Sequence, residues 1–72
     1  MLLEELLYLI NDSSTVELYD SATYDVIGTY DGKESIDEIY NECEVTDIFD
    51  TVKHGLTPYS VICIEINTQD TL

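Results

Sequence analysis

The run that most restricts the fold lies near the end of the chain, at residues 59–67, which read Tyr-Ser-Val-Ile-Cys-Ile-Glu-Ile-Asn. Successive side chains of a β-strand point to opposite faces, so Ile62, Ile64 and Ile66 share one face, and Val61 and Cys63 share the other. A sheet buries an apolar face only if another layer covers it. This run therefore predicts a strand. The rest of the chain has to supply the strands that pair with it and a layer that covers its apolar face.

Residues 2–10 are expected to form the covering helix. Apolar side chains recur at helical spacing at positions 3, 6, 7 and 10, whereas Glu4 and Tyr8 mark a solvent face. The two glutamates at positions 4 and 5 suit the positive end of a helix dipole. The polar run at residues 11–14 ends the helix and makes a turn.

Three further strands are predicted. In residues 15–20, Val16 and Leu18 point inward, whereas Glu17 and Tyr19 point outward. Residues 24–30 have strand composition and are expected to pair with this strand as a hairpin, with Gly28 marking a bulge. Residues 44–53 form a strand with imperfect alternation.

A short helix is expected between the second and third strands. Ser35 and Glu38 have the spacing of a capping box, in which each side chain binds the other residue's backbone amide. About two helical turns should follow and bury Ile36 and Ile39.

These elements predict an α+β fold in which the N-terminal helix packs on an antiparallel sheet of about four strands. A short helix lies between strands 2 and 3. At 72 residues, the chain (1–72) is expected to form a single acidic domain, because a second core could not be built from what remains. The predicted core consists of Leu7, Val16, Leu18, Ile62 and Ile64.

The charge restricts the partners. Sixteen Asp and Glu residues stand against Lys33 and Lys53, and the formal net charge is −14. Such a field repels nucleic acid and anionic membranes and attracts basic surfaces. The predicted partner is therefore a basic nucleic-acid-binding protein, with no direct nucleic acid and no membrane, and the chain itself is expected to be a monomer or weak homodimer. Solubility alone is the alternative explanation of the charge.

Catalysis and cofactors find little support in the residues. His54 is the sole histidine and no local signature joins it to a nucleophile. Cys43 and Cys63 do not fit zinc-ligand spacing, and the acids do not have the spacing of a calcium loop. We therefore expect a protein that is not an enzyme and holds neither a cofactor nor a metal. Two cysteines without a secretory signal indicate reduced thiols in a cytoplasm.

Acids and tyrosines together form the predicted binding surface. Carboxylates two residues apart on a strand lie roughly 6.6 Å apart, comparable to successive phosphates along a nucleic-acid strand. A carboxylate also accepts a bidentate arginine much as a phosphate does, and tyrosines are frequent interface anchors. The predicted partner-binding residues are Glu17, Asp20, Asp25, Glu34, Asp37, Glu38, Glu42, Glu44, Asp47, Asp50, Tyr19 and Tyr30.

The first thirty residues carry a resemblance to a known group. A helix with Leu6, Leu7 and Ile10, a polar turn, and then Thr-Val-Glu-Leu at residues 15–18 resembles the opening of small acidic anti-CRISPR proteins of the type II-A kind. It is also similar to small proteins of Gram-positive phages and mobile elements. The resemblance implies an inhibitor that occupies the DNA-recognition surface of an RNA-guided nuclease by carboxylate mimicry of phosphates. It also implies that the protein acts in the cytoplasm of a bacterial host cell. An acidic phage accessory, scaffolding or antitoxin-like protein that binds another basic protein is the alternative.

Overall fold

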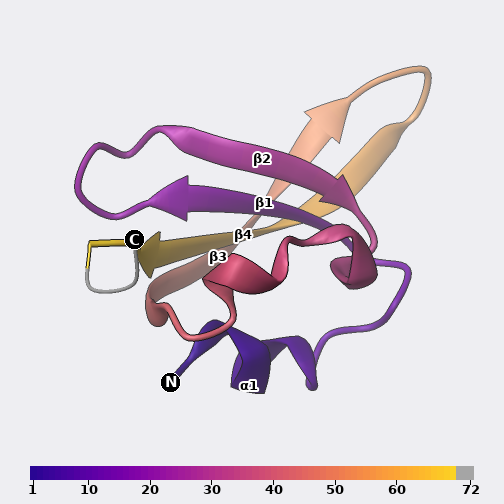
Figure 1. Cartoon of the computed structure of the whole chain (residues 1–72). Helices are drawn as coiled ribbons and strands as arrows, with labels where there is room; N and C mark the ends of the chain where they lie inside the picture. Colours follow the sequence, from indigo (N-terminus) through magenta and orange to yellow (C-terminus); the bar gives the residue numbers. More distant parts are fainter. Residues whose placement is uncertain (70–72) are drawn as a thin grey trace.

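The computed structural model describes residues 1–69 and contains one four-stranded sheet with a thin helical layer against one face (Figure 1). The elements in chain order are α1 (Leu3–Leu7), β1 (Thr15–Asp20), β2 (Val26–Asp31), the 3₁₀ turns η1 (Lys33–Ser35) and η2 (Glu38–Tyr40), β3 (Glu44–His54) and β4 (Pro58–Asn67). The sheet order is β2-β1-β4-β3. The predicted α+β class and the four strands are confirmed.

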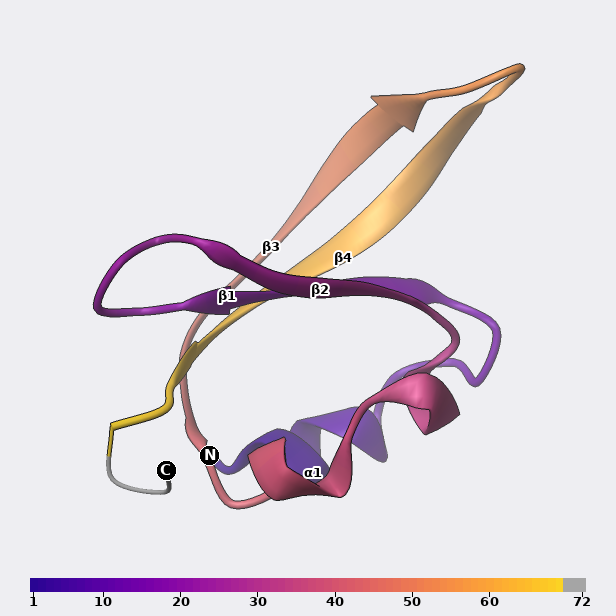
Figure 2. The same ribbon diagram turned by 45° about the horizontal axis from the view of Figure 1, so that its top comes forward.

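The sheet is mixed, so the expectation of a wholly antiparallel sheet is wrong. The β1–β2 and β3–β4 hairpins are antiparallel, but β1 and β4 run parallel at the centre, with Val16 opposite Ile62 and Leu18 opposite Ile64. The cause is the connection from β2 to β3, which passes beneath the sheet with η1 and η2 and brings β3 to the far edge (Figure 2). The chain then returns through β4 alongside β1.

Helix α1 is shorter than the predicted residues 2–10. The backbone amides of Leu9 and Ile10 bond to the carbonyls three residues earlier, at 2.9 and 3.3 Å, so the last turn tightens and the α-helix ends at Leu7. Leu3 and Leu6 are buried against the sheet, whereas Leu7 is only partly buried. The amphipathic pattern predicted the covering face correctly but not the length.

The expected two-turn helix with a Ser35–Glu38 capping box is also wrong. Two separate 3₁₀ turns replace it, and the N-cap of the second is Asp37, whose carboxylate accepts the Ile39 amide at 3.1 Å. Between the turns, Ile36 is extended and buried in the core. Inserting this side chain interrupts the helical hydrogen bonding and leaves Ile39 exposed.

The predicted bulge at Gly28 is confirmed. Leu18 pairs with Gly28 while Tyr19 pairs with Val26, so Ile27 is the additional residue on β2. A Cβ atom at position 28 would lie 2.9 Å from the Tyr30 hydroxyl, so a larger residue there would require the Tyr30 ring to shift. The strand begins two residues later than expected because Tyr24 has a φ of 61° and belongs to the turn.

The main core lies between α1 and the face of the sheet that it covers, hereafter the helix-side face. Its buried members are Leu3, Leu6, Val16, Leu18, Ile36, Cys43, Ile64 and Ile66. The predicted burial of Val16, Leu18 and Ile64 is confirmed, whereas Leu7 and Ile62 only pack against the cluster from its margin.

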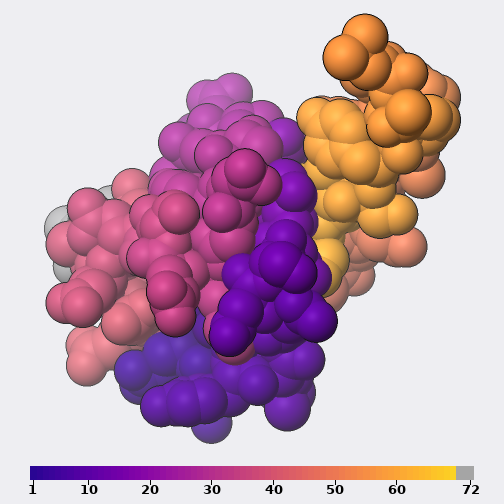
Figure 3. All heavy atoms as spheres, turned by 90° about the vertical axis from the view of Figure 1, so that its right-hand side faces the viewer, coloured from indigo at the N-terminus to yellow at the C-terminus, as the bar shows by residue number. Residues whose placement is uncertain are grey.

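The distal half of the β3–β4 hairpin extends away from this body (Figures 2 and 3). The molecule measures 38 × 25 × 17 Å along its principal axes. Within residues 1–69, no helix has the length and apolar character needed to cross a bilayer.

Candidate functional site

The strongest concentration of exposed acids lies on the helical layer, formed by α1, the turn after it and the η1–η2 connection. We call this surface the acidic layer. It consists of Glu4, Glu5, Asp12, Glu34, Asp37, Glu38 and Glu42, all exposed. The predicted residues Glu34, Asp37, Glu38 and Glu42 are thus brought together with three acids that the prediction did not include.

Three carboxylates of the acidic layer have partners within the fold. Glu5 accepts the Leu2 amide at 2.9 Å, Asp37 caps η2, and Asp12 forms a 3.2 Å ion pair with Lys33. Within the part of the chain that the structure describes, Glu4, Glu34, Glu38 and Glu42 have neither a hydrogen bond nor an ion pair through their side chains. These four charges are therefore hydrated and available to an external cation.

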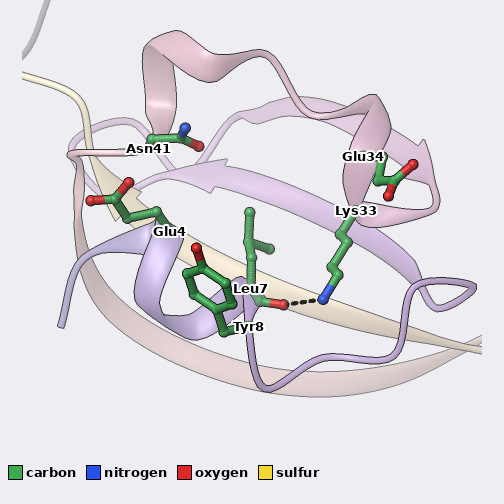
Figure 4. A pocket seen from close by; sticks show the side chains of 6 residues that line it. All are labelled: Glu4, Leu7, Tyr8, Lys33, Glu34 and Asn41. Carbon is green, nitrogen blue, oxygen red and sulfur yellow. Dashed lines mark hydrogen bonds between the residues drawn. The ribbon is translucent and has the colours of Figure 1, made fainter.

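A groove of about 240 Å³ opens between α1 and η1 within this layer (Figure 4). It is lined by Glu4, Leu7, Tyr8, Lys33, Glu34 and Asn41. Glu4 and Asn41 lie at one end and Glu34 at the other, with the Tyr8 ring between them. The carboxylate, amide and hydroxyl oxygens can accept hydrogen bonds from a lysine or arginine side chain.

Lys33 holds the walls of this groove together. Its Nζ donates to the carbonyl oxygens of Leu7, at 2.5 Å, and Ile10, at 2.8 Å, and it also reaches the Asp12 carboxylate. The amine thus satisfies carbonyls at the C-terminal end of α1, where a cation is favoured by the helix dipole.

Replacing Lys33 with methionine is expected to lower the free energy of unfolding by about 1–2 kcal/mol, because two carbonyls and Asp12 lose their cation. Thermal melting followed by circular dichroism measures this change, with Lys33→Arg as the charge-retaining control. Melting temperatures of Lys33→Met and the wild type that agree would show that the tether contributes nothing.

The predicted acids on β3 do not form a row. Glu44 is tied to the chain's N-terminal amine by a 3.0 Å ion pair, Asp47 lies opposite Glu65, and Asp50 lies opposite Ile62 on the other face. A bulge between Val45 and Asp47 shifts the alternation. The expectation of evenly spaced carboxylates along one strand face is therefore wrong here, although Glu44, Asp47 and Asp50 are each exposed.

Asp20 and Asp25 lie at the turn between β1 and β2. Asp20 accepts the Ala22 amide at 2.9 Å and the Thr68 hydroxyl at 3.2 Å, so its carboxylate stabilises this turn and the end of β4. Asp25 is exposed. Both belong to a different part of the surface from the acidic layer.

Glu17 is not at the surface, contrary to the prediction that it points outward to a partner. The residue lies on the face of the sheet opposite the helices, hereafter the open face, yet is only 4% exposed. Its carboxylate accepts hydrogen bonds from Tyr19 and, at 2.9 Å, from Thr29, and forms a 3.5 Å ion pair with Lys53. Strands β1, β2 and β3 each contribute a partner, so the group is internally satisfied.

The hydrogen bond from Tyr19 lowers the pKa of Glu17, and the bond from Thr29 and the charge of Lys53 add to this against the opposing effect of burial. The same bond, with burial, raises the pKa of Tyr19 to about 12. Burial, followed by the charge of Glu17, raises the pKa of the Cys63 thiol. A thiol with a raised pKa is a poor nucleophile, which favours a structural role for Cys63.

The tyrosines divide between structure and surface. Tyr19 packs on Phe49 with ring centroids 5.9 Å apart, and Tyr30 packs against the main core, where burial raises the pKa of its hydroxyl. Both side chains are half-buried, and their predicted role in partner binding stays a prediction. Tyr8 is 86% exposed and lines the groove. The i, i+4 spacing of Glu4 and Tyr8 on the solvent face of the helix was the signal for this part of the site.

Among residues 1–69, no group of three or more His, Cys, Asp or Glu side chains is arranged to hold a metal ion. No family model, no curated protein and no solved structure matches the chain.

Proposed function

We propose that this protein binds a basic nucleic-acid-binding protein through the acidic layer and thereby blocks that protein's nucleic-acid site. One observation carries the proposal: Glu4, Glu34, Glu38 and Glu42 are exposed on a single layer and have no partner within the described residues. A partner's arginines can therefore bind these carboxylates without displacing an internal cation. Arginine forks bind carboxylate and phosphate with the same bidentate geometry.

The groove adds shape to this charge. Glu4 and Glu34 at its two ends and the exposed Tyr8 ring between them offer a basic side chain two carboxylates and an aromatic surface. The net charge of −14 accelerates the approach of a basic partner and makes the association sensitive to salt. The resemblance of the first thirty residues makes an RNA-guided nuclease the partner to test first.

The test is a competition measurement. A purified nuclease binds fluorescent target DNA, and the protein is titrated in while anisotropy is recorded. We expect the DNA to be released, with release weakening as salt is raised. The triple substitution Glu4→Gln, Glu34→Gln and Glu38→Gln should weaken inhibition at least about tenfold, because each desolvated charge pair contributes on the order of 1 kcal/mol or more.

A matched variant separates this layer from net charge. This variant also removes three negative charges, but from exposed positions outside the acidic layer, by the substitutions Asp25→Asn, Asp47→Asn and Asp50→Asn. It should change inhibition by less than about threefold. Equal losses in the two triple variants would contradict a site on the acidic layer. Binding that leaves the nuclease–DNA complex intact would instead favour an accessory or scaffolding role.

A further inference from the structure

The outer edge of β3 is unpaired over most of its length. Leu2 bridges to Glu44, and the Val45 amide donates to the Met1 carbonyl at 2.8 Å, so the start of the strand is covered. From Asp47 to His54, no strand within residues 1–69 pairs with this edge, because β4 occupies the other side. Unpaired backbone N–H and C=O groups on an edge are a template for another strand.

Apolar side chains are exposed along the same edge and the hairpin that continues from it. They are Ile48, Phe49, Val52, Leu56 and Tyr59. The hairpin stands apart from the body, so α1 and the η1–η2 connection do not cover it (Figures 2 and 3). Exposed apolar side chains that gather on one projecting element are typical of an interaction surface.

Charge is segregated in the same way. Residues 51–64 contain no Asp or Glu, whereas they include Lys53 and the chain's sole histidine, His54. A basic partner would find no carboxylate on this stretch. Two copies of this acidic chain therefore repel one another least where this stretch meets its equivalent, and Asp47 and Asp50 are the β3 acids that lie just before it.

We propose that the protein forms a two-fold symmetric homodimer in which the β3 strands of two copies pair antiparallel along residues 47–55. The two sheets then join into one continuous sheet. The β3 edge of each copy forms its backbone hydrogen bonds with the β3 edge of the other, so the same surface is used twice, as in an isologous interface. This inference does not depend on the proposed function. It also sets both acidic layers on the same side of the joined sheet, since a two-fold axis perpendicular to the sheet preserves its faces.

Charge disfavours the register with Asp50 on the axis and permits the one with Thr51 there. With Thr51 on the axis, Phe49 lies opposite Lys53 of the second copy, and Asp50 lies opposite Val52 of the second copy. Phe49 and Lys53 share the open face because their β4 partners, Cys63 and Tyr59, are an even number of residues apart. The methylene chain of Lys53 can then contact the aromatic ring while its amine stays paired with Glu17. With Asp50 on the axis, the two Asp50 carboxylates would face one another, which is destabilising.

The test measures the mass of the full chain by sedimentation equilibrium over a range of concentrations. We expect a concentration-dependent dimer that strengthens as added salt screens the acidic bodies. Val52→Asp should weaken dimerisation about tenfold or more, because it places like charges in the interface. Val26→Asp is the matched control: it makes the same change at an equally exposed valine, but on β2, the opposite edge of the sheet. It should change the dissociation constant by less than about threefold.

Hydrogen exchange supplies a second readout. Dimerisation should slow exchange at alternate backbone amides between residues 47 and 54, since in a strand only alternate amides point to one edge. A monomeric mass at every concentration and salt level would overturn the proposal. So would equal weakening by Val26→Asp, or a dimer that forms without protecting β3 amides.

Discussion

Replacing Ile64 with alanine is expected to cost about 2–5 kcal/mol in the free energy of unfolding, a large part of the total for so small a domain. Ile64 is fully buried at the centre of β4, with Leu18 on one neighbouring strand and Ile48 on the other. Removing its side chain leaves a cavity between the sheet and α1, and α1 is too short to collapse far into it. Chemical denaturation of dilute protein measures the loss.

Ile48→Ala is the control for this prediction. The residue type is the same and Ile48 lies directly opposite Ile64, but its side chain is 47% exposed at the edge of the sheet. We expect a cost below about 1 kcal/mol, as for surface positions in general. Leu7→Ala should fall between the two, since Leu7 is partly buried. Equal costs for Ile64 and Ile48 would mean that Ile64 is no more deeply buried than the edge of the same face.

The strands were predictable from the sequence because a period of two is a local signal. The alternation in residues 15–20 and 59–67 identified β1 and β4 nearly to the residue. The parallel pairing of these strands was not predictable, because it depends on where a connection of twelve residues carries β3. One signal did point to a central strand: β4 has apolar side chains on both faces, as strands buried on both sides do.

The two helices were overpredicted for a physical reason that the pattern alone does not contain. Helical periodicity continues through Ile10, but an isolated helix of nine residues is marginal, and tertiary contacts decide where it ends. Lys33, twenty-three residues after Ile10, supplies the bonds that end it. Between β2 and β3, burying Ile36 outweighs continuous helical bonding.

The candidate site divides in the same way. Exposure of Glu34, Glu38 and Glu42 follows from their lying in a short polar connection, and the sequence predicted it. Burial of Glu17 did not follow, because alternation identifies the open face of β1 but not what lies over it. Its partners Thr29 and Lys53 arrive from two other strands.

Removing the Glu17 carboxylate is expected to have the second large effect. Glu17→Ala leaves the Tyr19 and Thr29 hydroxyls without their acceptor and Lys53 without its counter-ion, at a cost of about 1–3 kcal/mol at neutral pH. Because the pKa of Glu17 is lowered in the folded state, its contribution to stability changes with pH in a defined direction. A carboxyl whose pKa is lower in the folded state stabilises the fold above its unfolded pKa of 4.5, and the contribution is lost as pH falls through the folded pKa.

The wild type should therefore lose stability below about pH 4.5 more steeply than Glu17→Ala, which lacks this group. Glu65→Ala is the control, since Glu65 also lies on the open face but is half-buried on β4 and bonds to Thr46. It should cost less than Glu17→Ala, because only the Thr46 hydroxyl loses a carboxylate acceptor. If the wild type and Glu17→Ala lose stability equally as pH falls, the Glu17 carboxylate does not cause this acid dependence.

Tyr19 reports on the same network from the alkaline side. Its hydroxyl donates to Glu17, and losing the proton would set a phenolate against a carboxylate, which is why the pKa is raised to about 12. Ultraviolet titration detects the ionisation of each tyrosine, and the component missing from Tyr19→Phe belongs to Tyr19. This component should titrate near pH 12 in the wild type and move toward the ordinary pKa of 10 in Glu17→Ala. Because the pKa of Tyr19 is raised in the folded state, the Tyr19–Glu17 hydrogen bond contributes its full stability below pH 10. This contribution is lost as pH rises through about 12. Since general destabilisation does not move the pKa of one tyrosine in a protein that is still folded, an unshifted Tyr19 signal in Glu17→Ala would mean that the carboxylate is not its acceptor.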